Sequence, residues 1–224
     1  MLAGIKRQYL QYKAKSIDNL YLQEYLRTPK FNRATDYRQL EFLALDLEMT
    51  SLDVKTGEIV SIGFVPIVGG EIDIAQGFSA LVRNTQTVGE SATIHGICDR
   101  DAARGMAVED IFPPLFEALR GRVLLLHHAK VDLAFLDHYS RKIFGVPFAA
   151  TVVDTMALEL RRLKRRQPTI LPGQVRLYQC RERYGLPEYR AHDAYTDALA
   201  TAELFLAQAA AIADRGALPL RQLL

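Results

Sequence analysis

Hydrophobic and polar residues alternate over residues 41–48, and this alternation predicts a β-strand. One face would carry Leu43, Leu45 and Leu47, and the other would carry Phe42, Ala44, Asp46 and Glu48. Two further runs with strand character follow at residues 59–68 and 72–83, and Gly69-Gly70 between them is typical of a hairpin turn. We therefore expect three consecutive antiparallel strands.

Beyond residue 106 the pattern changes to helices that alternate with short apolar runs. It predicts a helix near 107–120, a strand at 122–127, a helix from about Val131 and a strand at 151–153, with helices up to the end. Three antiparallel strands followed by helix–strand units predict an α/β protein. Its mixed sheet, with later parallel strands and flanking helices, would be ribonuclease-H-like.

A chain of 224 residues can bury one substantial core. Residues 1–38 are predicted to form a basic helical extension that ends at Pro29, residues 39–214 the main domain, and residues 215–224 a C-terminal tail. Residues 1–40 hold eight basic and three acidic residues, a net +5, which leaves −3 for the rest of a chain of net charge +2. This extension could guide a polyanion or could form an ordinary solvated helix.

The composition argues against a membrane protein, a secreted protein and a protein built around zinc or disulfides. The hydrophobic fraction is 49%, but no apolar run approaches the roughly 20 residues that span a bilayer. We therefore expect no membrane partner, and the absence of an apolar signal near the N-terminus favours a cytoplasmic location. The two cysteines, Cys98 and Cys180, lack zinc-binding spacing and are expected to be reduced.

Three acidic residues, at two places in the chain, could hold a cation. Asp46 and Glu48, at i and i+2 of a strand, project from one face and could bind one hard metal ion, unless they lie on a solvent-facing edge strand. Asp132 follows the apolar run 123–126 and would lie near the carboxyl end of a strand, where open α/β sheets bind ligands. An acid that simply favours a helix N-terminus is the alternative explanation for Asp132.

His192 and Asp197 precede and begin the last long helix. Five residues apart, they would be about 140° apart on an ideal helix, so they cannot both face one ion from a regular helix. We expect His192 in the preceding loop, where imidazole could accept a proton, and Asp197 in the first turns, where it could hold a cation. Alone, His192 could equally be a surface residue.

Together these motifs resemble the histidine-type DEDD-superfamily 3′→5′ exonucleases, the family of the proofreading epsilon subunit of bacterial replicative DNA polymerase. The matching segments are Asp46-Leu47-Glu48, Asp132, His192 to Asp197, and Ile94-His95-Gly96-Ile97. The resemblance implies that Asp46, Glu48, Asp132 and Asp197 hold two Mg²⁺ or Mn²⁺ ions, with His192 as general base.

The same resemblance implies a substrate and partners. The substrate would be a single-stranded 3′ end, the product a nucleoside 5′-monophosphate, and the partner a DNA polymerase or repair complex. Thr50, His95 and Phe135 would contact the terminal nucleotide. Asp154-Thr155 also matches the family, although helix capping explains it.

Other functions remain open at this stage. Met49-Thr50-Ser51 stands where many relatives have Thr-Thr-Gly, and the string Asp-Leu-Glu-Met-Thr from Asp46 to Thr50 is instead similar to oligoribonuclease. Trimming of RNA 3′ ends by an oligoribonuclease-like or RNase T-like enzyme is therefore an alternative. His192-Asp193, together with His95, His127 and His128, also suggests a helical His-Asp metal phosphohydrolase, but the three leading strands argue against that class. A non-catalytic partner module is opposed by the intact acidic and histidine positions.

The basic run Arg161 to Arg166 has two explanations. It could follow the phosphates of a single strand, or its cations could simply favour a helix C-terminus.

Overall fold

The computed structural model describes residues 10–13, 16–84, 97, 99–167, 169–171, 173–189 and 192–224. Within these ranges, one mixed sheet contains β1 (Glu41–Met49), β2 (Ile59–Val68), β3 (Glu71–Ile72), β4 (Phe78–Leu81), β5 (Arg122–Leu126) and β6 (Val152–Asp154). The α-helices are α2 (Leu20–Arg27), α4 (Asp99–Ala102), α5 (Phe112–Leu119), α6 (Ala129–Phe144), α7 (Thr155–Lys164), α8 (Leu177–Glu182), α9 (Ala194–Ala213) and α10 (Leu220–Leu223). Short 3₁₀ helices are η1 (Tyr37–Gln39), η2 (Ile74–Gln76) and η4 (Val108–Ile111). No helix in the described ranges is long and apolar enough to cross a membrane.

The sheet has the predicted ribonuclease-H-like order. The strands run β3-β2-β1-β5-β6, and β4 also pairs with β2. β2 pairs antiparallel with β1, β3 and β4, whereas β1 and β5, and then β5 and β6, pair parallel. The predicted α/β class and the change from antiparallel to parallel strands are therefore confirmed.

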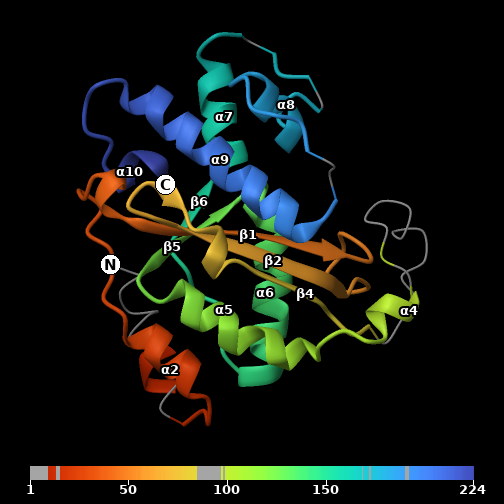
Figure 1. The fold of residues 1–224 in the computed structure, drawn as a ribbon. Helices are drawn as coiled ribbons and strands as arrows, with labels where there is room; N and C mark the ends of the chain where they lie inside the picture. Colours follow the sequence, from red (N-terminus) through yellow and green to blue (C-terminus); the bar gives the residue numbers. More distant parts are fainter. Residues whose placement is uncertain are drawn as a thin grey trace.

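Helices cover both faces of the sheet, and β1 lies between the two layers (Figure 1). Leu43, Leu45 and Leu47 are buried in a core cluster with residues of α2, α5 and α6. Phe42 and Ala44, on the other face, pack in a second cluster with residues of α7, α9 and α10. Since each fully buried Leu or Phe contributes about 1.5–3 kcal/mol, this alternation fixes the register of β1.

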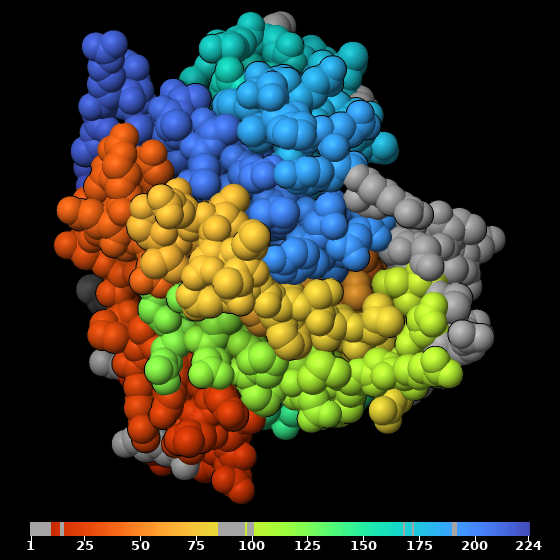
Figure 2. Space-filling view, viewed as in Figure 1, coloured from red at the N-terminus to blue at the C-terminus, as the bar shows by residue number. Residues whose placement is uncertain are grey.

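The two ends of the chain pack onto the domain. Leu10, Leu22 and Leu26 are buried in the core cluster of α5 and α6. Asp36 accepts a hydrogen bond from the Leu218 backbone N–H at 2.7 Å, and residues near 30–40 lie against the blue C-terminal residues in Figure 2. The division at residues 38 and 214 into separate units stays a prediction.

Two predicted elements differ from the structure. The N-terminal helix ends at Arg27, and residues 28–36 contain no helix. The predicted strand 72–83 is interrupted, because the Asp73 carboxylate accepts hydrogen bonds from Ala75 N–H at 3.1 Å and Gln76 Nε2 at 2.6 Å and so caps η2. Local capping thus overrides the strand pattern.

A glycine lets α9 approach the sheet. Gly63 lies on β2 directly opposite Asp46 of β1. A Cβ at Gly63 would overlap the backbone of Ala194 and Tyr195 in the first turn of α9. The absence of a side chain at residue 63 therefore brings the beginning of α9 against the strand pair that carries Asp46.

Replacing Gly63 with alanine should displace the first turn of α9. Because backbone atoms cannot rotate away as a side chain can, we expect Gly63→Ala to lower the free energy of unfolding by about 1–3 kcal/mol, as for an overpacked core. Urea denaturation measures this change. Gly216→Ala is the matched control, since its Cβ would lie 3.4 Å from the nearest atom. Equal stability of the two variants would contradict the close approach.

Candidate active site

Asp46 and Glu48 lie near the carboxyl end of β1. Asp46 is opposite Gly63 and Glu48 is opposite Ser61, and the β1–β2 register shifts after Glu48. Both acids are partly exposed, whereas Leu47 between them is buried. β1 is a central strand, so the alternative of a solvent-facing edge strand is wrong.

Asp132 is buried in the first turn of α6, with 4% of its surface exposed. Its Oδ1 accepts a hydrogen bond from the Leu47 backbone N–H at 3.2 Å. The turn into α6 is held by Asp154, whose carboxylate accepts from the N–H groups of His128 and Ala129, both at 3.1 Å. Asp132 is therefore attached to the strand that carries Asp46 and Glu48.

His192 and Asp197 divide as expected between the loop before α9 and its first turn. Asp193 is the N-cap of α9 and accepts a hydrogen bond from the Thr196 backbone N–H at 2.8 Å. His192 precedes it in the left-handed region, with φ 69°. Its backbone N–H donates to Asp197 Oδ2 at 2.9 Å. This bond joins the loop to the helix.

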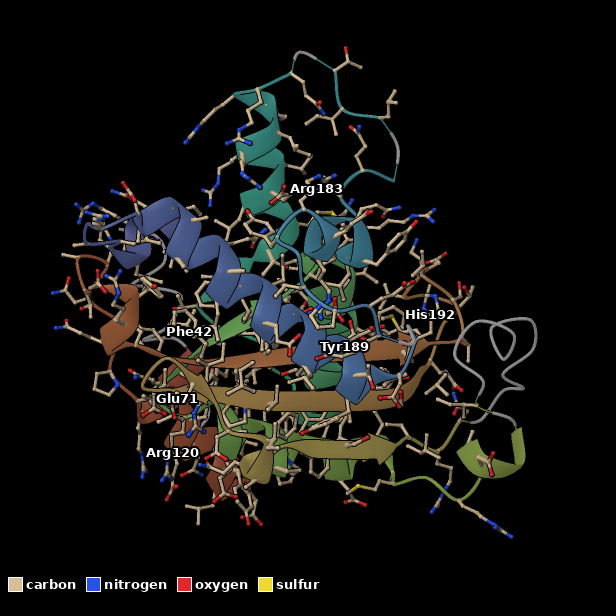
Figure 3. The ribbon with its side chains drawn as sticks, turned by 45° about the horizontal axis from the view of Figure 1, so that its top comes forward. Phe42, Glu71, Arg120, Arg183, Tyr189 and His192 are labelled. Atoms are coloured by element: carbon tan, nitrogen blue, oxygen red, sulfur yellow. The ribbon has the colours of Figure 1, made fainter. Side chains whose placement is uncertain are left out.

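The tertiary structure brings residues from β1 and α9 together. One ligand atom each of Glu48, His192 and Asp197 lies within 4.8 Å of the other two. Figure 3 shows His192 beside α9, at the end of the central strands. We call the five carboxylates that meet here the acidic cluster; they are Asp46, Glu48, Asp132, Asp193 and Asp197.

The acidic cluster is electrostatically unfavourable without a cation. Burial raises the pKa of Asp46 well above its usual range, and the other four charges of the cluster raise it further. Burial is also the largest cause that raises the pKa of Glu48 to about 8 and that of Asp132 to about 7. Burial raises the pKa of Asp197, although the hydrogen bond from His192 opposes this. Divalent cations, which prefer oxygen ligands, would relieve the repulsion.

Two residues of the site were not identified from the sequence. Asp193 adds a charge that raises the pKa of Asp46 and Glu48. Ser61, opposite Glu48, is 5% exposed, and its hydroxyl has no hydrogen-bond partner among the described residues. The Asp193-to-Thr196 spacing signals an N-cap, but the position of Ser61 depends on the β1–β2 register, which the sequence does not fix.

A buried arginine anchors the chain shortly before His192. Arg181 is 3% exposed and forms an ion pair with Glu203 of α9 at 2.7 Å. Its Nη2 also donates to the Pro187 carbonyl at 2.9 Å. Tyr189 donates its hydroxyl to Glu203 at 2.8 Å, and its ring centre lies 4.5 Å from the Arg181 guanidinium carbon. Residues 187–189 are thereby fixed against α9.

The ring of His127, which follows β5, has structural partners. His127 Nδ1 lies 2.8 Å from Thr155 Oγ1, and its Nε2 lies 2.9 Å from the Val175 carbonyl. Burial lowers the pKa of His127 to about 4, so the ring is neutral. Both of its nitrogens are occupied, which argues against a role as a metal ligand in a His-Asp phosphohydrolase.

The predicted substrate contacts have different surroundings. Thr50 is partly exposed, and its hydroxyl accepts a hydrogen bond from the Glu58 N–H at 2.9 Å. Phe135 is fully buried, and its ring packs in the protein interior next to Gly57. His95 lies outside the described residues. Nucleotide contact by these residues stays a prediction.

Comparison with known proteins identifies the family of the chain. The family model described as Exonuclease (RNase T) matches residues 43–205. The PolC-type DNA polymerase III of Thermotoga maritima is 31% identical over 74% of this chain, which spans only 12% of that protein. The DNA polymerase III subunit epsilon of Aquifex aeolicus is 26% identical, and the match covers 74% of this chain and 78% of that protein.

Solved structures share the fold. Exonuclease X in complex with 5′ overhanging duplex DNA superposes with a TM-score of 0.58 at 22% identity, covering 81% of this chain and 98% of the other. The nuclease domain of 3′hExo, a DEDDh family member, gives a TM-score of 0.62 at 16% identity, covering 77% of this chain and 92% of the other. The chain belongs to the Exonuclease (RNase T) family, and it is similar to the epsilon subunit of DNA polymerase III.

Proposed function

We propose that this protein hydrolyses single-stranded DNA from its 3′ end and releases nucleoside 5′-monophosphates. One observation carries the proposal. Glu48 comes from β1, and His192 and Asp197 come from the loop before α9 and from its first turn, yet their ligand atoms lie within 4.8 Å of one another, beside the partly exposed Asp46 and the buried Asp132. Carboxylates with an accessible imidazole can hold cations and accept a proton in one place.

The residues fit two divalent cations, Mg²⁺ or Mn²⁺. Asp46, Glu48, Asp132 and Asp197 would hold them, because hard oxygen ligands suit these ions and because none of the four carboxylates forms a salt bridge with a described residue. When bound, the cations would stabilise negative charge on the phosphate and on the leaving 3′-oxygen.

His192 would act as the general base that takes a proton from water. Its side chain is exposed, so water and a phosphodiester can reach it. Imidazole is suited to proton transfer near neutral pH. The hydrogen bond from its backbone N–H to Asp197 sets the base beside one of the proposed cation ligands.

DNA as substrate and a polymerase partner are supported by the relatives. Two of the similar proteins are a PolC-type DNA polymerase III and a DNA polymerase III subunit epsilon. The epsilon chain matches over most of its own length, which favours action on a replication product and association with a polymerase. Thr50 and His95 would contact the terminal nucleotide.

Trimming of RNA 3′ ends is the second candidate. The string from Asp46 to Thr50, Asp-Leu-Glu-Met-Thr, is similar to oligoribonuclease. The choice depends on whether the pocket for the terminal nucleotide accepts a 2′-hydroxyl.

Loss of the proposed base should slow cleavage without abolishing binding. We expect His192→Ala to lower the cleavage rate by about 10²–10⁴ while metal and oligonucleotide binding persist. A time course with 5′-labelled DNA and RNA of matched sequence, in Mg²⁺, Mn²⁺ and EDTA, measures the rate and the DNA:RNA preference.

His138→Ala is the matched control, because His138 is an exposed histidine on α6 outside the acidic cluster. The wild type should give a ladder that shortens from the 3′ end and needs a divalent cation. Full activity of His192→Ala would exclude it as the base, and cleavage by neither wild type nor control would favour a non-catalytic module.

The acidic cluster should make the metal-free protein less stable as pH rises. The folded-state pKa values of Glu48 and Asp132 are about 8 and about 7, above those of an unfolded chain, so the folded state binds more protons between about pH 4 and pH 8. The contribution of these groups to stability is therefore complete at low pH and is lost as pH rises to about 8. Melting temperatures in EDTA across this range measure the effect.

Removing one charge from the cluster should reverse this loss. We expect Asp46→Asn to melt above the wild type at pH 8 in EDTA, to differ less at pH 5, and to lose most of the stabilisation by Mg²⁺ and all measurable hydrolysis. Asp137→Asn, at a partly exposed acid on α6 that pairs with Arg141, is the control. An Asp46→Asn protein that is less stable than the wild type at pH 8 would contradict the electrostatic account.

A further inference from the structure

The basic run Arg161 to Arg166 lines a groove at the far end of α9 from the active site. The groove, with a volume of about 640 Å³, lies between the C-terminal half of α7, the end of α9 and α10 (Figure 1). Five of its lining residues are arginines; they are Arg161, Arg162, Arg165, Arg166 and Arg221. None of the described lining residues is acidic.

Two of these arginines hold the structure together. Arg161 donates to the backbone carbonyls of Leu223 and Leu224 at 3.1 and 2.8 Å, and so fixes α10 against α7. Arg162 lies 3.4 Å from the buried Glu159 and over the ring of Tyr184. Their guanidinium groups build one wall of the groove.

The other three arginines are exposed and point to a ligand. For Arg165, Arg166 and Arg221, the described part of the chain provides no carboxylate in an ion pair. Guanidinium groups remain charged at all physiological pH values, so these three arginines give the groove a permanent positive charge that an anion could bind. The helix C-terminus of α7 favours cations near Arg165, but α7 does not account for Arg221, which comes from α10.

We propose that this arginine groove binds the phosphates of the nucleic-acid substrate upstream of the 3′ end held in the active site. The proposal extends the proposed function and rests on it. Asp197 and Ala211 are 14 residues apart on α9, which places the groove about 21 Å from the acidic cluster. A strand that advances about 3.4 Å per nucleotide would cover this distance in roughly six nucleotides.

Phosphate is favoured over an acidic peptide for two reasons. The arginine fork matches phosphate oxygens and binds them without reading the base, as a nuclease that shortens any sequence requires. In addition, a strand already held at the active site reaches the groove at high effective concentration, so that even weak contacts would add affinity.

The groove should increase affinity for long substrates only. In the His192→Ala background, in which cleavage is expected to be about 10²–10⁴ slower, we expect Arg165→Glu/Arg166→Glu/Arg221→Glu to weaken binding of a labelled strand of about 20 nucleotides. The salt slope is the slope of the logarithm of the binding constant against the logarithm of the salt concentration. Loss of three phosphate contacts should reduce the magnitude of this slope by about 2, which corresponds to a roughly 100-fold lower affinity at about 0.1 M salt. Binding of a labelled trinucleotide, too short to reach the groove, should not change.

The control variant Arg27→Glu/Arg104→Glu/Lys142→Glu has the same change in charge at exposed residues elsewhere. It should keep the wild-type salt slope. The milder Arg→Gln triple variant tests the groove should the Glu variant fold poorly, as circular dichroism would show. With cleaving protein, the KM for the long strand should rise while kcat and trinucleotide hydrolysis are unchanged.

The outcomes separate the groove from the catalytic proposal. Three results would overturn the groove proposal. They are an unchanged salt slope in the triple variant, an equal loss of affinity for the trinucleotide and the long strand, and an equal loss of affinity in the control variant. Binding of polyglutamate that depends on the three arginines, without any change in oligonucleotide binding, would also overturn it and favour an acidic protein partner. Groove-dependent binding by a wild-type protein that cleaves nothing would contradict the catalytic function alone.

Discussion

The close contact between α9 and β2 at Gly63 determines the geometry of the active site. Gly63 pairs with Asp46, and the first turn of α9 lies on it with no room for a side chain. The same turn carries Asp197, whose carboxylate accepts the hydrogen bond from the His192 backbone. Residues from β1 and α9 can therefore share one site only because α9 approaches the sheet this closely at Gly63.

This contact brings negative charges together at the active site, where they are partly shielded from water. Five carboxylates meet there, and burial raises the pKa of several of them toward or above neutrality. A fold that served stability alone would pair such groups with basic residues, as Arg181 is paired with Glu203 nearby. The cost to stability is consistent with a site whose balancing charges are bound cations and whose ligand is a phosphodiester.

The two ends of α9 have opposite electrostatic character. Its first turn lies in the acidic cluster, while its last turns border the arginine groove. Cations at the acidic end and arginines at the basic end would both present positive charge to a polyanion along one helix. In the proposed arrangement the acidic end would provide the chemistry, and the basic end would retain the strand without reading its sequence.

Local periodicity was sufficient to predict the α/β class, the face shared by Asp46 and Glu48, and the separation of His192 from the helix of Asp197. The four-motif resemblance added the family. The interruption of the third strand by η2 came from a local cap at Asp73, which competes with strand pairing and which the alternation of residues did not reveal. The burial of Phe135, the position of Ser61 opposite Glu48 and the contribution of Arg221 to the groove depended on the tertiary structure, because each results from contacts between segments far apart in the chain, about which local patterns carry no information.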